Sequence, residues 1–154
     1  MRCRRPAGVR MSDSLHVVCP NCHTTNRVAR ARLGDGATCG SCKKPLLEGH
    51  PFELTKASFD RHVGADDLPL VVDFWAPWCA PCRTMAPAYE DAAARLAPGV
   101  RLAKLDTEAE PEIAARFGIR GIPTLIAFRN GREVARQSGA MAAPQLLRWI
   151  EANI

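Results

Sequence analysis

The sequence VVDFWAPWCAPCRTM, residues 71–85, decides the fold of this protein. Its first half continues an apolar run that begins at Pro69 and is rich in valine and aromatic residues, which is typical of a buried central strand. The segment 81–96 has the apolar spacing of a helix, with Pro87 inside it as an expected bend. A C-x-x-C pair, Cys79 and Cys82, therefore stands where a strand gives way to a helix.

Strand and helix patterns alternate in order on both sides of this stretch. The expected strands are 52–54, 69–76, 100–105, 124–128 and 133–137, and the expected helices are 81–96, 111–117, 143–153 and a segment that starts near Ser58. Turn residues support these limits, since Gly118 follows one predicted helix and Asn130-Gly131 is a hairpin signal between the last two strands. The order β-α-β-α-β-α-β-β-α predicts an α/β fold with a mixed central sheet and helices on both faces.

The position of Cys79 and Cys82 indicates redox chemistry. A thiol at a helix N-terminus faces unpaired backbone N–H groups and the positive end of the helix dipole, and both favour the thiolate. Cys79 is therefore expected to be the nucleophile, and Cys82, one turn further on, to attack the mixed disulfide that Cys79 forms. Pro81 fixes φ in the first turn without losing a needed donor. A metal-binding pair or two inert buried thiols are the alternatives.

Residues 52–154 resemble the thioredoxin family. The matching residues are Trp78-Cys79-Ala80-Pro81-Cys82, Asp73, Gly121-Ile122-Pro123-Thr124, Lys104 and Gly139. The resemblance implies the thioredoxin fold and a protein-disulfide reductase that acts on disulfide-containing client proteins. It also implies that thioredoxin reductase, drawing on NADPH, returns the two cysteines to the dithiol state.

The resemblance further implies roles for single residues. Asp73 matches a buried carboxylate that helps to move protons as the second cysteine attacks, and Lys104 matches a neighbour of that carboxylate. Pro123 matches a cis proline beside the disulfide, and the backbone of Ile122 can pair with an extended substrate. The residues expected to frame the substrate groove are Trp75, Trp78, Pro81 and Gly139. A purely structural buried acid is the alternative for Asp73, and core packing or plain solvation is the alternative for Trp75, Trp78 and Lys104.

One position departs from the family pattern, because Ala80 stands where a glycine is usual. The residues between the two cysteines influence thiolate stability and hence the reduction potential, which is near ~−270 mV in thioredoxin. A reductant is still expected, since Pro81 is retained and alanine adds a single methyl group.

Four further cysteines precede this region. Cys19, Cys22, Cys39 and Cys42 form two C-x-x-C pairs separated by 16 residues, which is a spacing typical of zinc sites. Residues 15–50, the four-cysteine module, are too poor in apolar residues to bury a core, so one structural zinc ion with four thiolate ligands is expected to hold them together. Disulfides in an oxidising compartment, or a second redox pair, are the alternatives. A module of this kind in front of such a domain resembles the thioredoxin 2 type.

The net charge of +5 comes mostly from residues 1–10, which contain four arginines. The remaining residues hold 17 basic and 16 acidic side chains, so no nucleic-acid surface is expected, and Arg27, Arg30 and Arg32 are interpreted as a solvated face. Residues 1–14 are expected to be a disordered basic leader, which contains Cys3, lacks the apolar core of a secretory signal and has Met11 as an alternative start. No apolar run approaches the roughly 18 residues of a membrane span.

The sequence thus predicts a cytoplasmic monomer with three regions: the leader (1–14), the four-cysteine module (15–50) and a thioredoxin domain (52–154). The histidines, His16, His23, His50 and His62, are expected to lie at the surface. The alternative function is a redox-regulated binding protein or holdase, in which the module grips partner proteins and releases its metal on oxidation.

Overall fold

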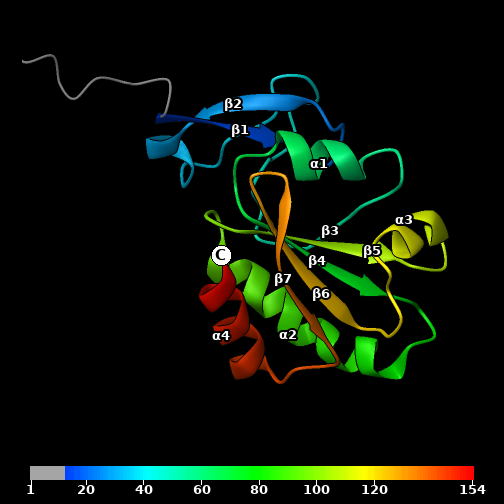
Figure 1. Ribbon diagram of the computed structural model, residues 1–154. Helices are drawn as coiled ribbons and strands as arrows, with labels where there is room; N and C mark the ends of the chain where they lie inside the picture. Colours follow the sequence, from blue (N-terminus) through cyan, green and yellow to red (C-terminus); the bar gives the residue numbers. More distant parts are fainter. Residues whose placement is uncertain (1–12) are drawn as a thin grey trace, which may run out of the picture.

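The computed structural model describes residues 13–154, so the predictions for Cys3, Met11 and nearly all of the leader lie outside the described residues. Five strands form a mixed sheet in the order β3-β5-β4-β6-β7, and two more strands form a separate small sheet, β1-β2 (Figure 1). No helix within residues 13–154 is long and apolar enough to cross a membrane.

The strands of the large sheet lie within one residue of their predicted limits. They are β3 (Phe52–Glu53), β4 (Leu70–Trp75), β5 (Arg101–Asp106), β6 (Thr124–Arg129) and β7 (Arg132–Ser138). β3 and β4 run parallel to β5, whereas β6 is antiparallel to β4 and β7 to β6. The predicted mixed α/β fold is therefore confirmed.

Helices cover both faces of this sheet, and they are α1 (Phe59–Ala65), α2 (Ala80–Leu96), α3 (Pro111–Arg116) and α4 (Ala143–Asn153). On one face, Phe59 of α1 and Ile113 of α3 pack in a core with Phe74 of β4. On the other face, Tyr89 of α2 and Leu146 of α4 belong to a second core (Figure 1). α2 continues through Pro87, and its first residue directly follows Cys79.

The four-cysteine module contains β1 (Ser14–Val18) and β2 (Thr25–Ala29), which pair antiparallel, and a short 3-10 helix, Arg30–Arg32. The prediction that this module buries no core is wrong. It has a small one, whose buried members are Leu15, Val17, Cys19, Val28, Cys39, Leu46 and Leu68. Leu68 comes from the segment just before β4, so the module completes its core with a residue of the thioredoxin domain.

A buried ion pair fixes the module to the sheet. Arg101 of β5 pairs with Asp66, and their side chains are 4% and 2% exposed. The Arg101 Nη1 group also donates to the Val18 carbonyl oxygen at 2.7 Å, while the Val18 N–H donates to Asp66 Oδ2 at 3.0 Å. Both the N–H and the carbonyl group of Val18, the residue before Cys19, are thus hydrogen-bonded to this ion pair. We call the pair the Asp66–Arg101 clamp.

The surface prediction is wrong for His62, which is 1% exposed. α1 packs against β1 and places His62 beneath the module, where its Nε2 lies 3.0 Å from Nδ1 of His23. Burial is the main reason that the pKa of His62 is lowered to about 3, and the positive charge of Arg101 adds to it. His62 is therefore a neutral packing residue of the interface between the module and the domain.

Candidate active site and metal centre

Cys79 and Cys82 form a disulfide at the start of α2. Cys79 is the N-cap residue of this helix, with extended backbone (φ −81°, ψ 108°), and its sulfur accepts the Cys82 N–H at 3.2 Å. Pro81 lies in the first turn, as its fixed φ favours. The chain turns from β4 into α2 through Ala76 to Trp78, so the strand end and the helix start together place the two sulfurs.

The loop before β6 lies against the disulfide. The carbonyl oxygen of Ile122 is 3.7 Å from Cys79 Sγ, and the Ile122–Pro123 peptide bond is cis. Gly139 donates its N–H to the Pro123 carbonyl oxygen at 2.8 Å, in a conformation with φ +95° that glycine adopts readily. Trp75 and Ile122 pack against the two cysteines, so both residues lie beside the disulfide.

Trp78 is 64% exposed beside this surface. Its indole Nε1 donates to Oε1 of Glu108 at 2.6 Å, which fixes the ring on the loop that follows β5. Glu108 was not among the predicted site residues. The sequence indicates a role for it only through its position just after β5, a strand that ends at this edge of the sheet. A large exposed aromatic ring next to a disulfide suits contact with another polypeptide.

Asp73 is a buried carboxyl on β4, 1% exposed, and its Oδ1 has no hydrogen-bond partner among residues 13–154. Burial raises the pKa of Asp73 to about 7, Lys104 opposes this rise, and Glu53 adds to it. Lys104 is in register with Asp73 on β5 and places its Nζ 4.1 Å from the centre of the Trp75 ring. A carboxyl with this pKa exchanges its proton near neutral pH.

Tyr89 is a buried residue of α2 that packs on the sheet near Asp73. Its hydroxyl donates to the carbonyl oxygens of Val71 and Ala103, at 3.0 and 2.7 Å. Burial, followed by the charge of Asp73, raises the pKa of Tyr89 well above its ordinary value. Asp73 therefore lies on the face of the sheet that α2 covers, and Cys82 begins the same buried side of this helix.

The second site is formed by Cys19, Cys22, Cys39 and Cys42, whose sulfurs all lie within 4.8 Å of one another. Two closely similar turns bring them together. In each, the N–H two residues after the first cysteine donates to its sulfur at 3.3 Å, from Asn21 in one turn and Ser41 in the other. Each turn then closes through a residue with positive φ, His23 at 63° and Lys43 at 67°.

These four sulfurs fit a tetrahedral metal ion. The distances from Cys19 to Cys42 and from Cys22 to Cys39 are 3.6 and 3.5 Å. A Zn–S distance of about 2.3 Å gives sulfur–sulfur separations of about 3.8 Å in a tetrahedron, well beyond the ~2.05 Å of a disulfide. Hydrogen bonds from the Cys42 backbone and from Asn26 lower the pKa of the Cys39 thiol to about 6, which favours the thiolate that a metal binds. The four-cysteine cluster is therefore a metal site.

The structure thus gathers the predicted site residues into two separate places. Cys79 and Cys82 lie with Trp75 and Ile122 at the carboxyl end of β4, and Asp73 and Lys104 lie within β4 and β5. The four metal-site cysteines belong to the module that packs on Leu68, just before the amino end of β4, and the strands of this module, β1 and β2, lie apart from the large sheet (Figure 1). His23 is not aimed at the metal site, because its Nδ1 faces His62.

Known proteins resemble the chain along both parts. The family model described as Thioredoxin matches residues 50–152, and the model described as Thioredoxin 2, N-terminal matches residues 18–44. Thioredoxin C-3 from Corynebacterium nephridii is 40% identical over 138 residues, which are 90% of this chain and 94% of that protein. The thioredoxin of Rhodospirillum rubrum is 41% identical over 102 residues, 66% of this chain and 98% of its own. The chain therefore belongs to the thioredoxin family of disulfide oxidoreductases, and its N-terminal module is the zinc ribbon of the thioredoxin 2 type.

Proposed function

We propose that this protein reduces disulfide bonds of client proteins, with Cys79 as the nucleophile and Cys82 as the resolving cysteine. The observation that carries the proposal is the place of Cys79 at the N-cap of α2, where the Cys82 N–H reaches its sulfur. In the reduced protein the same N–H group and the helix dipole favour a Cys79 thiolate. The disulfide between the two cysteines is the product state of the proposed reaction.

The reaction consists of two thiol–disulfide exchanges. The Cys79 thiolate attacks one sulfur of the client disulfide, a mixed disulfide forms, and the other client sulfur leaves as a thiolate. Cys82 then loses its proton and attacks Cys79 Sγ, so the Cys79–Cys82 disulfide forms and the second client sulfur leaves. Two electrons pass from the dithiol to the client, and the two client thiolates take up protons from solvent, while the proton that Cys82 loses stays on the protein.

Asp73 is the proposed acceptor of the Cys82 proton, and Lys104 is its proposed partner. With a pKa of about 7, the Asp73 carboxyl is partly ionised at neutral pH, so it both takes a proton and gives it back. Lys104 is in register with Asp73 on β5, and its positive charge limits the rise that burial causes in the pKa of Asp73. The same carboxyl would return a proton to Cys82 when the disulfide is reduced again.

The proposed substrate groove surrounds the exposed edge of the disulfide. An extended client segment would lie beside Ile122, whose carbonyl oxygen is 3.7 Å from Cys79 Sγ. Large side chains of the client would meet the exposed Trp78 ring. The full set of residues proposed to contact the client is Trp75, Trp78, Pro81, Ile122, Pro123 and Gly139.

Zinc is the proposed ion of the four-cysteine site, because Cys19, Cys22, Cys39 and Cys42 provide a closed set of four soft ligands at suitable spacing. Such an ion would stabilise the fold of the module and leave no coordination position for a substrate. The proposal keeps the division into a module, 15–50, and a thioredoxin domain, 52–154.

Thioredoxin reductase, drawing on NADPH, is the proposed source of electrons for the Cys79–Cys82 disulfide. The cytoplasm is the proposed location, because a reducing dithiol and four metal-binding thiols both persist in a reducing compartment. The proposed working form is a monomer that binds protein clients and no nucleic acid.

Reduction of insulin disulfides by dithiothreitol tests the roles of the two cysteines. Cys79→Ser should abolish catalysis, and Cys82→Ser should abolish turnover but accumulate a mixed disulfide with the client, visible by mass spectrometry. Thr84→Ala is a matched control near the start of α2, since Thr84 is exposed and its hydroxyl donates to the Ala80 carbonyl oxygen within the helix. Full turnover by either cysteine variant, or a mixed disulfide on Cys79→Ser, would overturn the assignment.

A further inference from the structure

Lys104 lies between two carboxylates on neighbouring strands. It is in register with Glu53 on β3 and with Asp73 on β4, and both of these strands run parallel to β5. Residues in register on adjacent strands point to the same face of a sheet. Glu53, Lys104 and Asp73 therefore form a row across three strands, with the positive charge in the middle.

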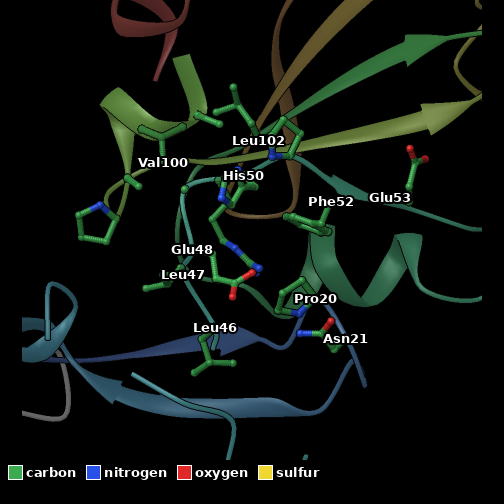
Figure 2. Close-up of a pocket in the computed structure, with 16 residues that line it drawn as sticks. Pro20, Asn21, Leu46, Leu47, Glu48, His50, Phe52, Glu53, Val100 and Leu102 are labelled. Atoms are coloured by element: carbon green, nitrogen blue, oxygen red, sulfur yellow. The ribbon is translucent and has the colours of Figure 1, made fainter. Parts of the chain in front are cut away.

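This row lies on the face that α2 and α4 cover. Val71 and Leu102, two residues before Asp73 and Lys104, belong to the core beneath those helices. The Lys104 ammonium stays on this side, over the Trp75 ring. At the outer end of the row, Glu53 is exposed and lines a cavity of ≈330 Å³ between the four-cysteine module and the sheet (Figure 2).

Few other charges face the row among the described residues. On the α2 side Asp73 faces Tyr89, which burial keeps neutral, and its β6 neighbour, Leu125, is apolar. Glu53 faces Lys104 and, more weakly, Asp106. Burial is the main cause of the raised pKa of Asp73, Lys104 lowers this pKa, and Glu53 raises it further. Glu53 is exposed as a residue, but its carboxyl loses part of its hydration, which raises the pKa of Glu53; Lys104 lowers this pKa and Asp106 raises it.

We propose that Glu53 is a positioning residue for proton transfer at Asp73: it shares the Lys104 ammonium, so that Lys104 does not hold Asp73 permanently as a carboxylate. The inference rests on the proposed role of Asp73. In the step concerned, a proton passes from the Cys82 thiol to Asp73, the Cys82 sulfur keeps the electron pair, and nothing is oxidised until that sulfur attacks Cys79. Glu53 touches none of these atoms and acts through Lys104.

The size of the effect follows from the sheet geometry. Glu53 and Asp73 are two strand spacings apart, about 9.5 Å. An effective dielectric constant between about 20 and 80 converts this separation into a shift of roughly 0.3 to 1.3 pH units in the pKa of Asp73. Because the Debye length falls to about 3 Å at 1 M salt, high salt should reduce the shift wherever the path between the charges is solvated.

The test compares Glu53→Gln with Glu48→Gln. Glu48 lines the same cavity on the side away from Glu53, and it has no register partner on β5 (Figure 2). In the oxidised protein, with 13C-labelled aspartate, the Asp73 carboxyl resonance is assigned through its loss in Asp73→Asn. We expect Glu53→Gln to lower the pKa of Asp73 by roughly 0.3 to 1.3 units, and Glu48→Gln to change it much less.

A kinetic measurement links this shift to function. The pH profile for insulin reduction should have one limb that depends on Asp73, and this limb is identified by its loss in Asp73→Asn. In Glu53→Gln the same limb should move to lower pH, by the amount that the NMR titration gives for the pKa of Asp73. An Asp73 pKa that is unchanged or raised in Glu53→Gln, or equally lowered in Glu48→Gln, would overturn the inference and leave the proposed function intact. A pH profile that Asp73→Asn does not alter would instead remove Asp73 from the mechanism, and with it the role of Glu53.

Discussion

Replacing Arg101 by methionine tests how the four-cysteine module is held to the thioredoxin domain. The substitution keeps an unbranched apolar stem of similar length on β5 but removes the guanidinium from the Asp66–Arg101 clamp. Asp66, with its side chain 2% exposed, would then be a buried carboxylate without its counter-charge. The Val18 carbonyl oxygen would also lose the donor that now lies 2.7 Å away.

The structure sets the magnitude. Breaking a buried ion pair by removing one partner costs about 3–5 kcal/mol, because the remaining charge stays buried. A domain of this size has a total stability of roughly 5–15 kcal/mol, so Arg101→Met should remove a large part of it. Asp66→Asn in the same chain should restore part of the loss, since it removes the stranded charge. The double variant should therefore be more stable than Arg101→Met alone.

Urea unfolding of the metal-loaded protein, followed by tryptophan fluorescence, measures these changes. Arg95→Met is the matched control, because the Arg95–Asp91 pair is on the surface, with side chains 64% and 55% exposed. Removing such a pair costs about 1 kcal/mol or less. If Arg101→Met and Arg95→Met had the same urea midpoint, or if the double variant were no more stable than Arg101→Met, the clamp would not hold the module as argued.

Three further predictions concern Asp73, Trp78 and the metal. The pKa of Asp73 rises from 3.8 to about 7 on folding, so the folded state binds more protons between these pH values and the protein loses stability as the pH rises through them. Asp73→Asn should therefore add roughly 2–4 kcal/mol to the free energy of unfolding at pH 8 and almost nothing at pH 4. Urea titration at the two pH values measures this difference. Glu108→Ala should raise the KM for insulin by roughly 3- to 10-fold with little change in kcat, because the Trp78 ring loses its hydrogen bond; an unchanged KM would show that this bond does not position the ring. Removing the metal with a chelator should abolish hydrogen-exchange protection of the amides of β1 and β2, while the amides of β4 and β6 stay protected. If the β1 amides stayed protected without metal, the fold of the module would not depend on the ion.

The elements around the dithiol were predictable because local pattern and tertiary role agree there. β4 is apolar at almost every position since helices cover both faces of the sheet, and the alternation in β5 reflects the two sides of a strand. The C-x-x-C spacing likewise predicted both cysteine sites, because a tight turn alone determines how two sulfurs three residues apart can meet. These signals are all local in the sequence.

The contacts that sequence reasoning missed are all long-range. Nothing near His62 indicates that β1, 44 to 48 residues earlier in the chain, will cover it. Arg101 and Asp66 are 35 residues apart, and they meet because β5 lies beside the segment before β4. Glu53 gains its place beside Lys104 from the register of a two-residue strand, which is too short to leave a periodic pattern. Charged residues have no preferred partner in the sequence, so only the fold determines which of them meet.

The placement of the module limits how it influences the chemistry. Leu68, which completes the module's core, and Trp75, which packs beside the disulfide, are at opposite ends of the segment that contains β4, roughly 23 Å apart along an extended chain. At that separation, with an effective dielectric constant between about 20 and 80, one unit of charge at the metal site shifts the pKa of a sulfur by roughly 0.1 to 0.5 unit, so its direct effect is small. The module adjoins the amino end of β4 through Leu68, whereas Trp75 and Ile122 pack beside the disulfide at the other end of this strand. A larger effect of the metal on disulfide exchange would travel through the sheet, by way of the Asp66–Arg101 clamp and the packing of β4 against β5. We expect it to shrink to the direct electrostatic effect in a variant whose clamp is broken but whose sheet remains folded.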